Sequence, residues 1–175
     1  GRALYWEAKM MQGVAALKDK NYKSAIQFIN EAQEWPENLG AGKPYDTDID
    51  NRLEQYLQYI CFNALHQLDS AQALLNKITT FKPGIYNTIR NFQPANHLIT
   101  KWAYEIKNEK FNWNEWMETQ KNKFPQFKET FNWVLSKANN SAENSNTTED
   151  PWMRVIQEVM YTADSTKYDA YIFIQ

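Results

Sequence analysis

The chain has few of the residues that build covalent frameworks or metal centres. It contains one cysteine and two histidines among 175 residues, so no disulfide can form within it. Cys61 lies in the apolar run 59–62, where a small buried side chain is the expected role. His66 and His97 are far apart, and neither has a partner at metal-ligand spacing. We therefore expect no metal site and no cofactor.

Long apolar runs and an excess of one charge are also missing. No stretch approaches the roughly 20 apolar residues that a membrane-spanning helix needs, and no signal peptide is visible at the start. The formal net charge is -2, with lysine and glutamate interleaved, so nucleic-acid binding is not expected. This composition is typical of a globular domain. The absence of an initiator methionine at Gly1 suggests a piece cut from the C-terminal part of a longer protein.

Catalytic and ligand-binding motifs are incomplete. Asp46, Asp48 and Asp50 alternate like the first ligands of a calcium loop, but the glycine and glutamate that complete such a loop are missing, so helix capping is favoured. The segment 40–44 (GAGKP) has the wrong glycine spacing for a phosphate loop and proline in place of the hydroxyl residue. No Ser-His-Asp set or acidic pair can be assembled. The segment is therefore predicted to be non-enzymatic.

What the sequence does contain is helical periodicity. Apolar residues recur at three- and four-residue spacing on two faces of the segment 4–18, which predicts a helix enclosed by neighbours. Residues 19–21 (DKN) interrupt the pattern, and a second helix is predicted from Tyr22 to about Trp35. Because so short a connection forces two helices to run antiparallel, residues 4–35 are predicted to form a helical hairpin.

This hairpin resembles a tetratricopeptide repeat. Gly13 stands where the first helix of that motif carries a small residue, and Ala25 and Ala32 follow at matching positions on the second helix. Tyr22 at the turn and Pro36 at the exit also fit, although Pro36 falls one residue early. The departures from the motif are Lys9 in place of Trp, Gln12 in place of Leu, and Ala16 in place of Tyr.

Two further hairpins are predicted downstream. The second covers 48–81 after a linker over 37–50; its first helix is capped by Asp48 or Asp50 and continues to about Leu68. Ala71, Leu75 and Ile78 repeat the spacing found in the first hairpin. The third hairpin, over 94–124, is degenerate. It has a proline suited to its first turn, Pro94, and a capping pair, Asn112 and Glu115.

The rest of the chain is predicted to close the array. A helix is expected over 127–137, then a flexible polar loop over 138–149, and then a helix that begins at Asp150 and Pro151. The tail after residue 163 fits either a docked helix or an extended segment. The predicted fold is therefore all-α: a short superhelix of TPR-like hairpins over 1–137 with capping helices over 150–175.

A narrower resemblance covers about residues 3–81. The first hairpin, the run WPENLGAGKP and the second hairpin are similar to the C-terminal repeat region of multidomain bacterial proteins, in which such repeats follow a β-sandwich resembling carbohydrate-processing domains. The activity of those proteins is unassigned. The composition, rich in asparagine and tyrosine, suits a Bacteroidetes-like bacterium.

The resemblance implies an interaction scaffold that binds a protein, a peptide or another domain of the parent chain. Its groove would be the concave face formed by the first helix of each hairpin. The residues predicted to line it are Glu7, Met10, Val14, Lys18, Gln55, Gln58, Phe62, His66, His97, Thr100 and Tyr104. The alternative is a carbohydrate-binding or carbohydrate-enzyme accessory module in which exposed tryptophans stack on sugars. Its candidates are Trp102, Trp113, Trp116 and Trp152.

Overall fold

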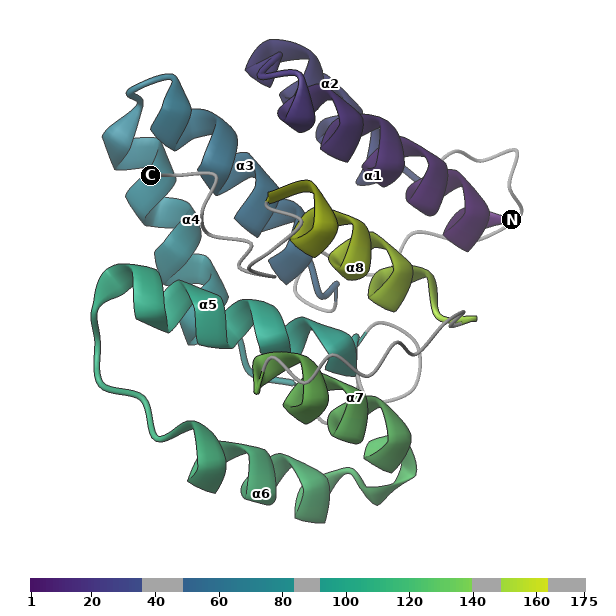
Figure 1. The fold of residues 1–175 in the computed structure, drawn as a ribbon, viewed down its shortest axis with the longest axis vertical. Coiled ribbons are helices and arrows are strands. Elements are labelled where there is room, and N and C mark those ends of the chain that lie inside the picture. The colour runs from purple at the N-terminus through teal and green to yellow at the C-terminus, as the bar shows by residue number, and fades with distance from the viewer. Residues whose placement is uncertain (36–48, 84–91, 140–148, 164–175) are drawn as a thin grey trace.

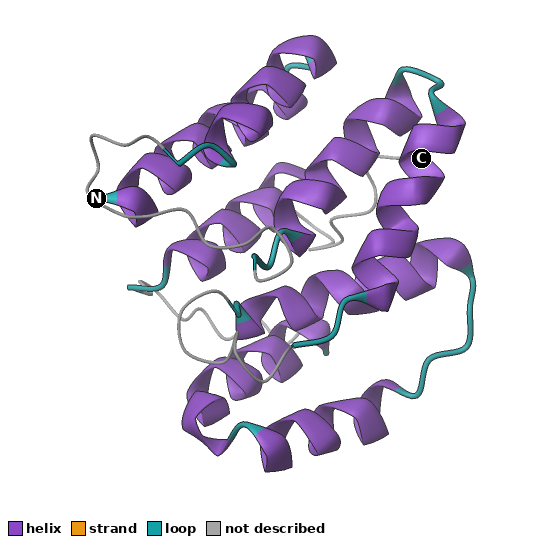
Figure 2. Ribbon diagram, turned by 180° about the vertical axis from the view of Figure 1, so that it is seen from behind, coloured by secondary structure: helices purple, strands orange, loops and turns teal. Residues whose placement is uncertain are grey.

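The protein is all-α. The computed structural model describes residues 1–35, 49–83, 92–139 and 149–163, and over these ranges it has eight α-helices, two short 3-10 segments and no strand (Figures 1 and 2). Asp46 and Asp48 of the alternating aspartates, the glycine-rich segment 40–44, nearly all of the linker and polar loop, and the tail lie outside the described residues. Within the described ranges, no helix is both long enough and apolar enough to cross a membrane.

The first hairpin consists of α1, Arg2–Lys18, and α2, Tyr22–Ala32. The two helices approach most closely at Gly13, where an added Cβ would lie 3.1 Å from Cγ1 of Ile29. A larger side chain would push α2 away, which is why the position needs a small residue. Ala25 and Ala32 are buried on the opposing helix, so the predicted close packing of this pair is confirmed.

The second hairpin consists of α3, Arg52–Ala64, and α4, Leu68–Thr80. The prediction that the first of these helices continues to about Leu68 is wrong, because the helix stops at Ala64 and α4 already begins at Leu68. His66 has φ of 59°, and this left-handed conformation ends a right-handed helix. At the start of α3 the N-cap residue is Asn51 and not Asp48 or Asp50, but Asp50 Oδ1 does accept the Arg52 backbone N–H at 3.3 Å.

The region predicted as a third hairpin contains the 3-10 segment η3, Pro94–Asn96, and the helices α5, His97–Lys107, and α6, Trp113–Lys123. Unlike the first two pairs, α5 and α6 barely contact each other, and α7 packs against both of them. The predicted capping pair is confirmed. Asn112 Oδ1 accepts the Glu115 backbone N–H at 3.3 Å, and Asn112 Nδ2 donates to Glu115 Oε2 at 2.8 Å. The helical pattern therefore persists where the repeat signature is weakest.

All three hairpin turns use the same backbone device. A non-glycine residue adopts the left-handed conformation after the first helix of each pair: Lys20, His66 and Asn108. The next residue then donates its N–H to a carbonyl five positions earlier, at 2.8, 2.9 and 3.1 Å in chain order. This is the bond of a Schellman motif, which satisfies a free carbonyl at a helix end. The three turns are thus alike in backbone conformation although the sequences around them differ.

The described part of the chain continues with a 3-10 segment, η4 (Pro125–Phe127), and two helices, α7 (Lys128–Ala138) and α8 (Pro151–Ala163). Asp150 Oδ1 accepts the backbone N–H of Trp152 at 2.8 Å and of Met153 at 3.3 Å, so the predicted helix start at 150–151 is confirmed. Rather than extending the array beyond α7, α8 packs against α1 and η3. Figure 1 shows it beside α1, between the first hairpin and the later helices.

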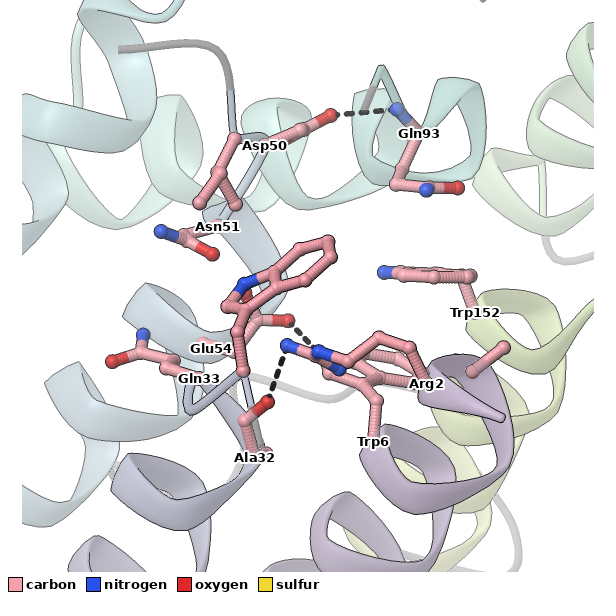
Figure 3. A pocket seen from close by; sticks show the side chains of 12 residues that line it. Arg2, Trp6, Ala32, Gln33, Asp50, Asn51, Glu54, Gln93 and Trp152 are labelled. Atoms are coloured by element: carbon pink, nitrogen blue, oxygen red, sulfur yellow. Dashed lines mark hydrogen bonds between the residues drawn. The ribbon is translucent and has the colours of Figure 1, made fainter. Parts of the chain in front are cut away.

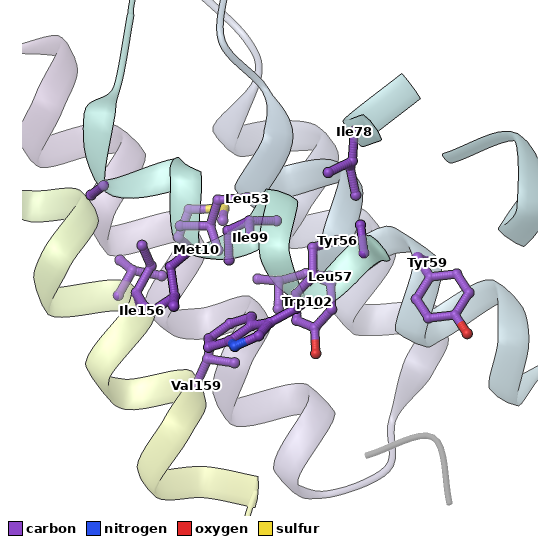
Figure 4. Packing of buried hydrophobic residues seen from close by; sticks show 14 of the residues in the cluster. Met10, Leu53, Tyr56, Leu57, Tyr59, Ile78, Ile99, Trp102, Ile156 and Val159 are labelled. Atoms are coloured by element: carbon purple, nitrogen blue, oxygen red, sulfur yellow. The ribbon is translucent and has the colours of Figure 1, made fainter. Parts of the chain in front are cut away.

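The position of α8 follows from the two apolar faces of α1. One face packs against α2 and another against α8, so α1 is enclosed as its periodicity predicts. Figure 4 shows Met10 of α1 near Ile156 of α8, with Leu53 and Ile99 of the second and third hairpins close by. All four side chains are buried. The core therefore runs through α8 and is shared by α1, α3 and α5.

Candidate functional site

A pocket of about 340 Å³ opens where α1, the end of α2, the start of α3 and α8 meet (Figure 3). This volume lies at the lower end of the range typical of small-molecule sites. Three indoles and several planar polar side chains surround it. The lining residues are Arg2, Ala3, Trp6, Ala32, Gln33, Trp35, Ile49, Asp50, Asn51, Glu54, Gln93 and Trp152.

The aromatic part of the pocket is built from both ends of the chain. The rings of Trp6 on α1 and Trp152 on α8 stack with centroids 4.2 Å apart and an interplanar angle of 22°. The third ring, Trp35, has the Arg2 guanidinium 4.5 Å from its centroid. The same guanidinium donates from Nη2 to the Ala32 carbonyl at 2.8 Å, which fixes its position at the end of α2.

Glu54 supplies the pocket with a buried carboxyl group that is only 2% exposed. Its Oε1 accepts a hydrogen bond from Trp6 Nε1 at 3.0 Å. Burial, reinforced by the nearby Asp50, raises the pKa of Glu54 to about 8, while the Trp6 bond and the charge of Arg2 act in the opposite direction. At neutral pH this side chain is therefore mainly the uncharged acid, able to donate as well as accept a hydrogen bond.

Asp50, the other carboxylate of the pocket, is committed to structural bonds. Both of its oxygens face Arg52, at 2.9 Å from Nε and 2.7 Å from Nη2. Asn96 Nδ2 and the backbone N–H of Gln93 add further donors at 3.2 and 3.0 Å. With its oxygens occupied in this way, Asp50 positions the start of α3 beside η3.

Arg52 itself is fully buried, and its remaining donors bind the third hairpin. Nη1 lies 2.8 Å from His97 Nδ1 and donates to Thr100 Oγ1 at 3.0 Å. The opposite ring nitrogen of His97 is 3.3 Å from Gln120 Oε1. Burial, and then the charge of Arg52, lower the pKa of His97 well below its ordinary value. The imidazole is therefore neutral, accepting from Arg52 through Nδ1 and donating to Gln120 through Nε2.

The pocket also contains polar groups that have no protein partner. The Nε of Arg2 and the indole N–H groups of Trp35 and Trp152 are buried and make no hydrogen bond. Figure 3 shows the nitrogen edge of Trp152 turned toward the middle of the pocket. An unsatisfied buried donor costs about 1–3 kcal/mol. These nitrogens have almost no accessible surface, and Trp113 and Trp133 outside the pocket carry unpartnered buried indole N–H groups as well.

Several of the predicted groove residues lie inside the protein and cannot contact a partner in this conformation. Met10 and Val14 are buried in the core that α1 shares with α8, and His97 and Thr100 are buried around Arg52. Glu7 is bound by Arg154 of α8 through two hydrogen bonds of 2.6 and 2.8 Å. The face of α1 that was expected to be open is therefore covered by α8.

The remaining predicted groove residues do not gather into one cavity. Lys18 and His66 are exposed near the turns, whereas Gln55 and Phe62 are half-buried on α3. The other two, Gln58 and Tyr104, contact residues of neighbouring helices. Gln58 Nε2 donates to Asn30 Oδ1 at 3.0 Å. The Tyr104 hydroxyl donates to the Thr79 carbonyl at 3.2 Å, and the Tyr104 ring stacks on Phe111 with centroids 4.1 Å apart.

Of the tryptophans considered for sugar stacking, Trp152 alone lines the pocket. Trp102 is buried against Tyr56, and Trp113 and Trp116 are half-buried beside one another at 5.9 Å. The sequence interpretation missed four lining residues: Arg2, Trp6, Trp35 and Glu54. The sequence signal that could have indicated the site was a tryptophan near each end of the first hairpin.

Fold and site together define an all-α protein of helical hairpins with a tryptophan-lined pocket. Comparison with protein-family models, curated proteins and solved structures gave no match. Among the described residues, no three His, Cys, Asp or Glu side chains are grouped so that they could hold a metal ion. The function is therefore inferred from the pocket.

Proposed function

We propose that this protein is a non-catalytic saccharide-binding module, built on an array of tetratricopeptide-like hairpins, and that the sugar occupies the tryptophan-lined pocket. The observation that carries the proposal is the composition of the pocket wall: three indoles together with arginine, carboxyl and carboxamide side chains. A pyranose presents an apolar C–H face and a rim of hydroxyl groups that both donate and accept. Aromatic rings suit the first feature and planar polar groups suit the second.

The array itself is proposed on the packing of α1 with α2 and of α3 with α4, on the close approach at Gly13, and on the turn conformation that the three helix pairs share. Binding of a protein partner through an open concave face has less support, because α8 covers the α1 part of that face. A small ligand needs only the pocket beside α8. The accessory-module alternative is thus the one that the geometry favours.

The pocket's carboxyl groups support binding without turnover. Glycosidases generally use two carboxyl groups, one as an acid and one as a base or nucleophile. Asp50 accepts from Arg52, Asn96 and Gln93 and so has no lone pair to spare for a sugar carbon or a water. Among the described lining residues, Glu54 is then the one carboxyl group available for catalysis, and the glycosidase mechanism requires two.

The test is binding to an array of neutral and acidic oligosaccharides, followed by calorimetric titration of those that bind. Trp35→Ala should weaken binding at least about fivefold, since base–aromatic stacking of comparable area contributes about 1–3 kcal/mol. Trp113→Ala is the matched control, because Trp113 is also half-buried with an unpartnered buried Nε1 but lies outside the pocket. Circular dichroism confirms that both variants remain folded. Absence of binding to every saccharide, or equal affinity of the Trp35 variant and the unmodified protein, would overturn the proposal.

A further inference from the structure

One wall of the pocket belongs to α8, the last helix that the structure describes. Its contribution is Trp152, which is half-buried and whose ring stacks on Trp6 of α1 with centroids 4.2 Å apart. The other lining residues come from earlier parts of the chain, from Arg2 to Gln93. The shape of the pocket therefore depends on where α8 sits along and around α1.

A two-point ion pair joins the same two helices directly beside this wall. Arg154 Nε and Nη2 donate to Glu7 Oε1 and Oε2 at 2.6 and 2.8 Å. Glu7 follows Trp6 in the chain, and Arg154 comes two residues after Trp152. A pair with two parallel hydrogen bonds fixes the orientation of its partners as well as their distance. We call it the Glu7–Arg154 clamp, and neither of its residues lines the pocket.

The apolar contacts of α8 determine its register on α1 less strictly than the clamp does. Neighbouring pairs follow the same order along both helices, which therefore run parallel (Figure 4): Trp6 with Trp152, Glu7 with Arg154, and Met10 with Ile156. Apolar contacts are not directional, and hydrophobic cores lose a unique arrangement before they lose stability. The buried face of α8 thus holds the helix on α1, whereas the clamp specifies its exact position.

We infer that Glu7 and Arg154 are positioning residues of the ligand site, because their clamp sets the register of α8 and so places the Trp152 ring in the pocket wall. This inference rests on the saccharide function proposed above, and it concerns two residues that would not touch the sugar. The side chains of Arg154 and Glu7 are 33% and 16% exposed, and partly exposed ion pairs contribute little to stability. Loss of the clamp should therefore alter the site while the fold persists.

The first measurement needs no ligand. Two stacked indoles give an exciton couplet in far-ultraviolet circular dichroism, and subtracting the spectrum of the matching Trp152→Phe variant isolates the couplet of Trp6 and Trp152 from other tryptophans. Arg154→Met removes both bonds of the clamp, so this couplet should lose much of its amplitude. Lys9→Met is the matched control, because it removes a 2.6 Å ion pair that joins α1 to Glu31 of α2 and not to α8. It should leave the couplet unchanged.

The second measurement titrates each variant with the neutral and acidic oligosaccharides of the array described above. Arg154→Met should weaken binding about 2- to 30-fold, the range for substitutions that change a site without contacting its ligand. Lys9→Met should not weaken it. Arg154→Lys keeps the charge without the planar fork and should lose less, which keeps the test decisive if Arg154→Met unfolds. Exchanging the charges, with Glu7→Arg and Arg154→Glu together, should restore part of the couplet and of the affinity.

The possible outcomes separate the two proposals. An unchanged couplet or an unchanged affinity in both Arg154 variants would overturn the positioning role and leave saccharide binding in place. An equal loss of affinity in Lys9→Met would also overturn it, because any ion pair on α1 would then have the same effect. If the unmodified protein bound none of the oligosaccharides, the saccharide function would fail and the role of the clamp in binding with it. The couplet would still decide whether the clamp positions Trp152.

Discussion

Replacing Glu54 with glutamine should change how the stability of the protein depends on pH. The glutamine amide has the shape of the protonated acid, so its oxygen can still accept from Trp6 Nε1, which lies 3.0 Å from Glu54 Oε1. It cannot ionise. The substitution therefore leaves the packing and the hydrogen bond in place and removes the titration of a buried carboxyl group.

The direction follows from the two pKa values. The pKa of Glu54 is raised from 4.5 to about 8 by burial and by Asp50, so the unfolded chain releases the proton over a pH range in which the folded protein keeps it. The stabilising contribution is fully present below pH 4.5 and is lost as the pH rises toward 8. Each pH unit in this window lowers the free energy of unfolding by up to about 1.4 kcal/mol. From pH 5 to 7.5 the loss approaches about 3 kcal/mol.

The assay is urea unfolding at 25 °C, followed by circular dichroism at constant ionic strength from pH 5 to 8. The free energy of unfolding of Glu54→Gln, minus that of the unmodified protein, should rise steadily with pH. Glu129→Gln, at an exposed position on α7, is the control and should give a flat difference. Parallel curves for Glu54→Gln and the unmodified protein would refute the reasoning, because they would mean that Glu54 titrates alike in the folded and unfolded states.

Three further substitutions test the frame around the pocket in the same unfolding assay. Arg52→Met should cost about 3–5 kcal/mol, because it leaves Asp50 buried without its cation; a loss below about 1 kcal/mol would contradict the network described. His66→Gly should stabilise by about 0.5–1 kcal/mol by relieving the left-handed conformation at φ 59°, and a loss of stability would show that the histidine side chain contributes more than the strain costs. Asp150→Ala should lower stability by about 1 kcal/mol through loss of its bonds to the first turn of α8, and no change would mean that these bonds contribute little.

Local features of the fold could be predicted from the sequence because their causes are local. The helix starts at Asn112 and Asp150 depend on a side chain that reaches a backbone N–H two or three residues away. The hairpin at Gly13 depends on small residues at fixed spacing. The left-handed turn at His66 was missed because histidine, unlike glycine, does not mark such a conformation in a sequence.

The pocket could not be predicted because its parts come from distant segments. An apolar face on α1 indicates that something must cover it but does not specify which helix. The Trp6–Trp152 stack joins residues at opposite ends of the chain. Arg52 and Glu54 fall at the start of a helix, where charged residues are ordinary, and only tertiary packing buries them. Aromatic content indicated a stacking site, but its location depended on where α8 docks.

The docking of α8 on α1 also governs how the chain can fold. In an open repeat array each unit contacts only its neighbours, so part of the array can fold by itself. Here the Glu7–Arg154 bond spans 147 residues, and α8 contacts both the first helix and η3. Such long-range closure raises contact order and slows folding. During synthesis, the α1 face that α8 covers therefore stays uncovered until α8 has been made, so the first hairpin completes its packing only after the helices between them have been synthesised.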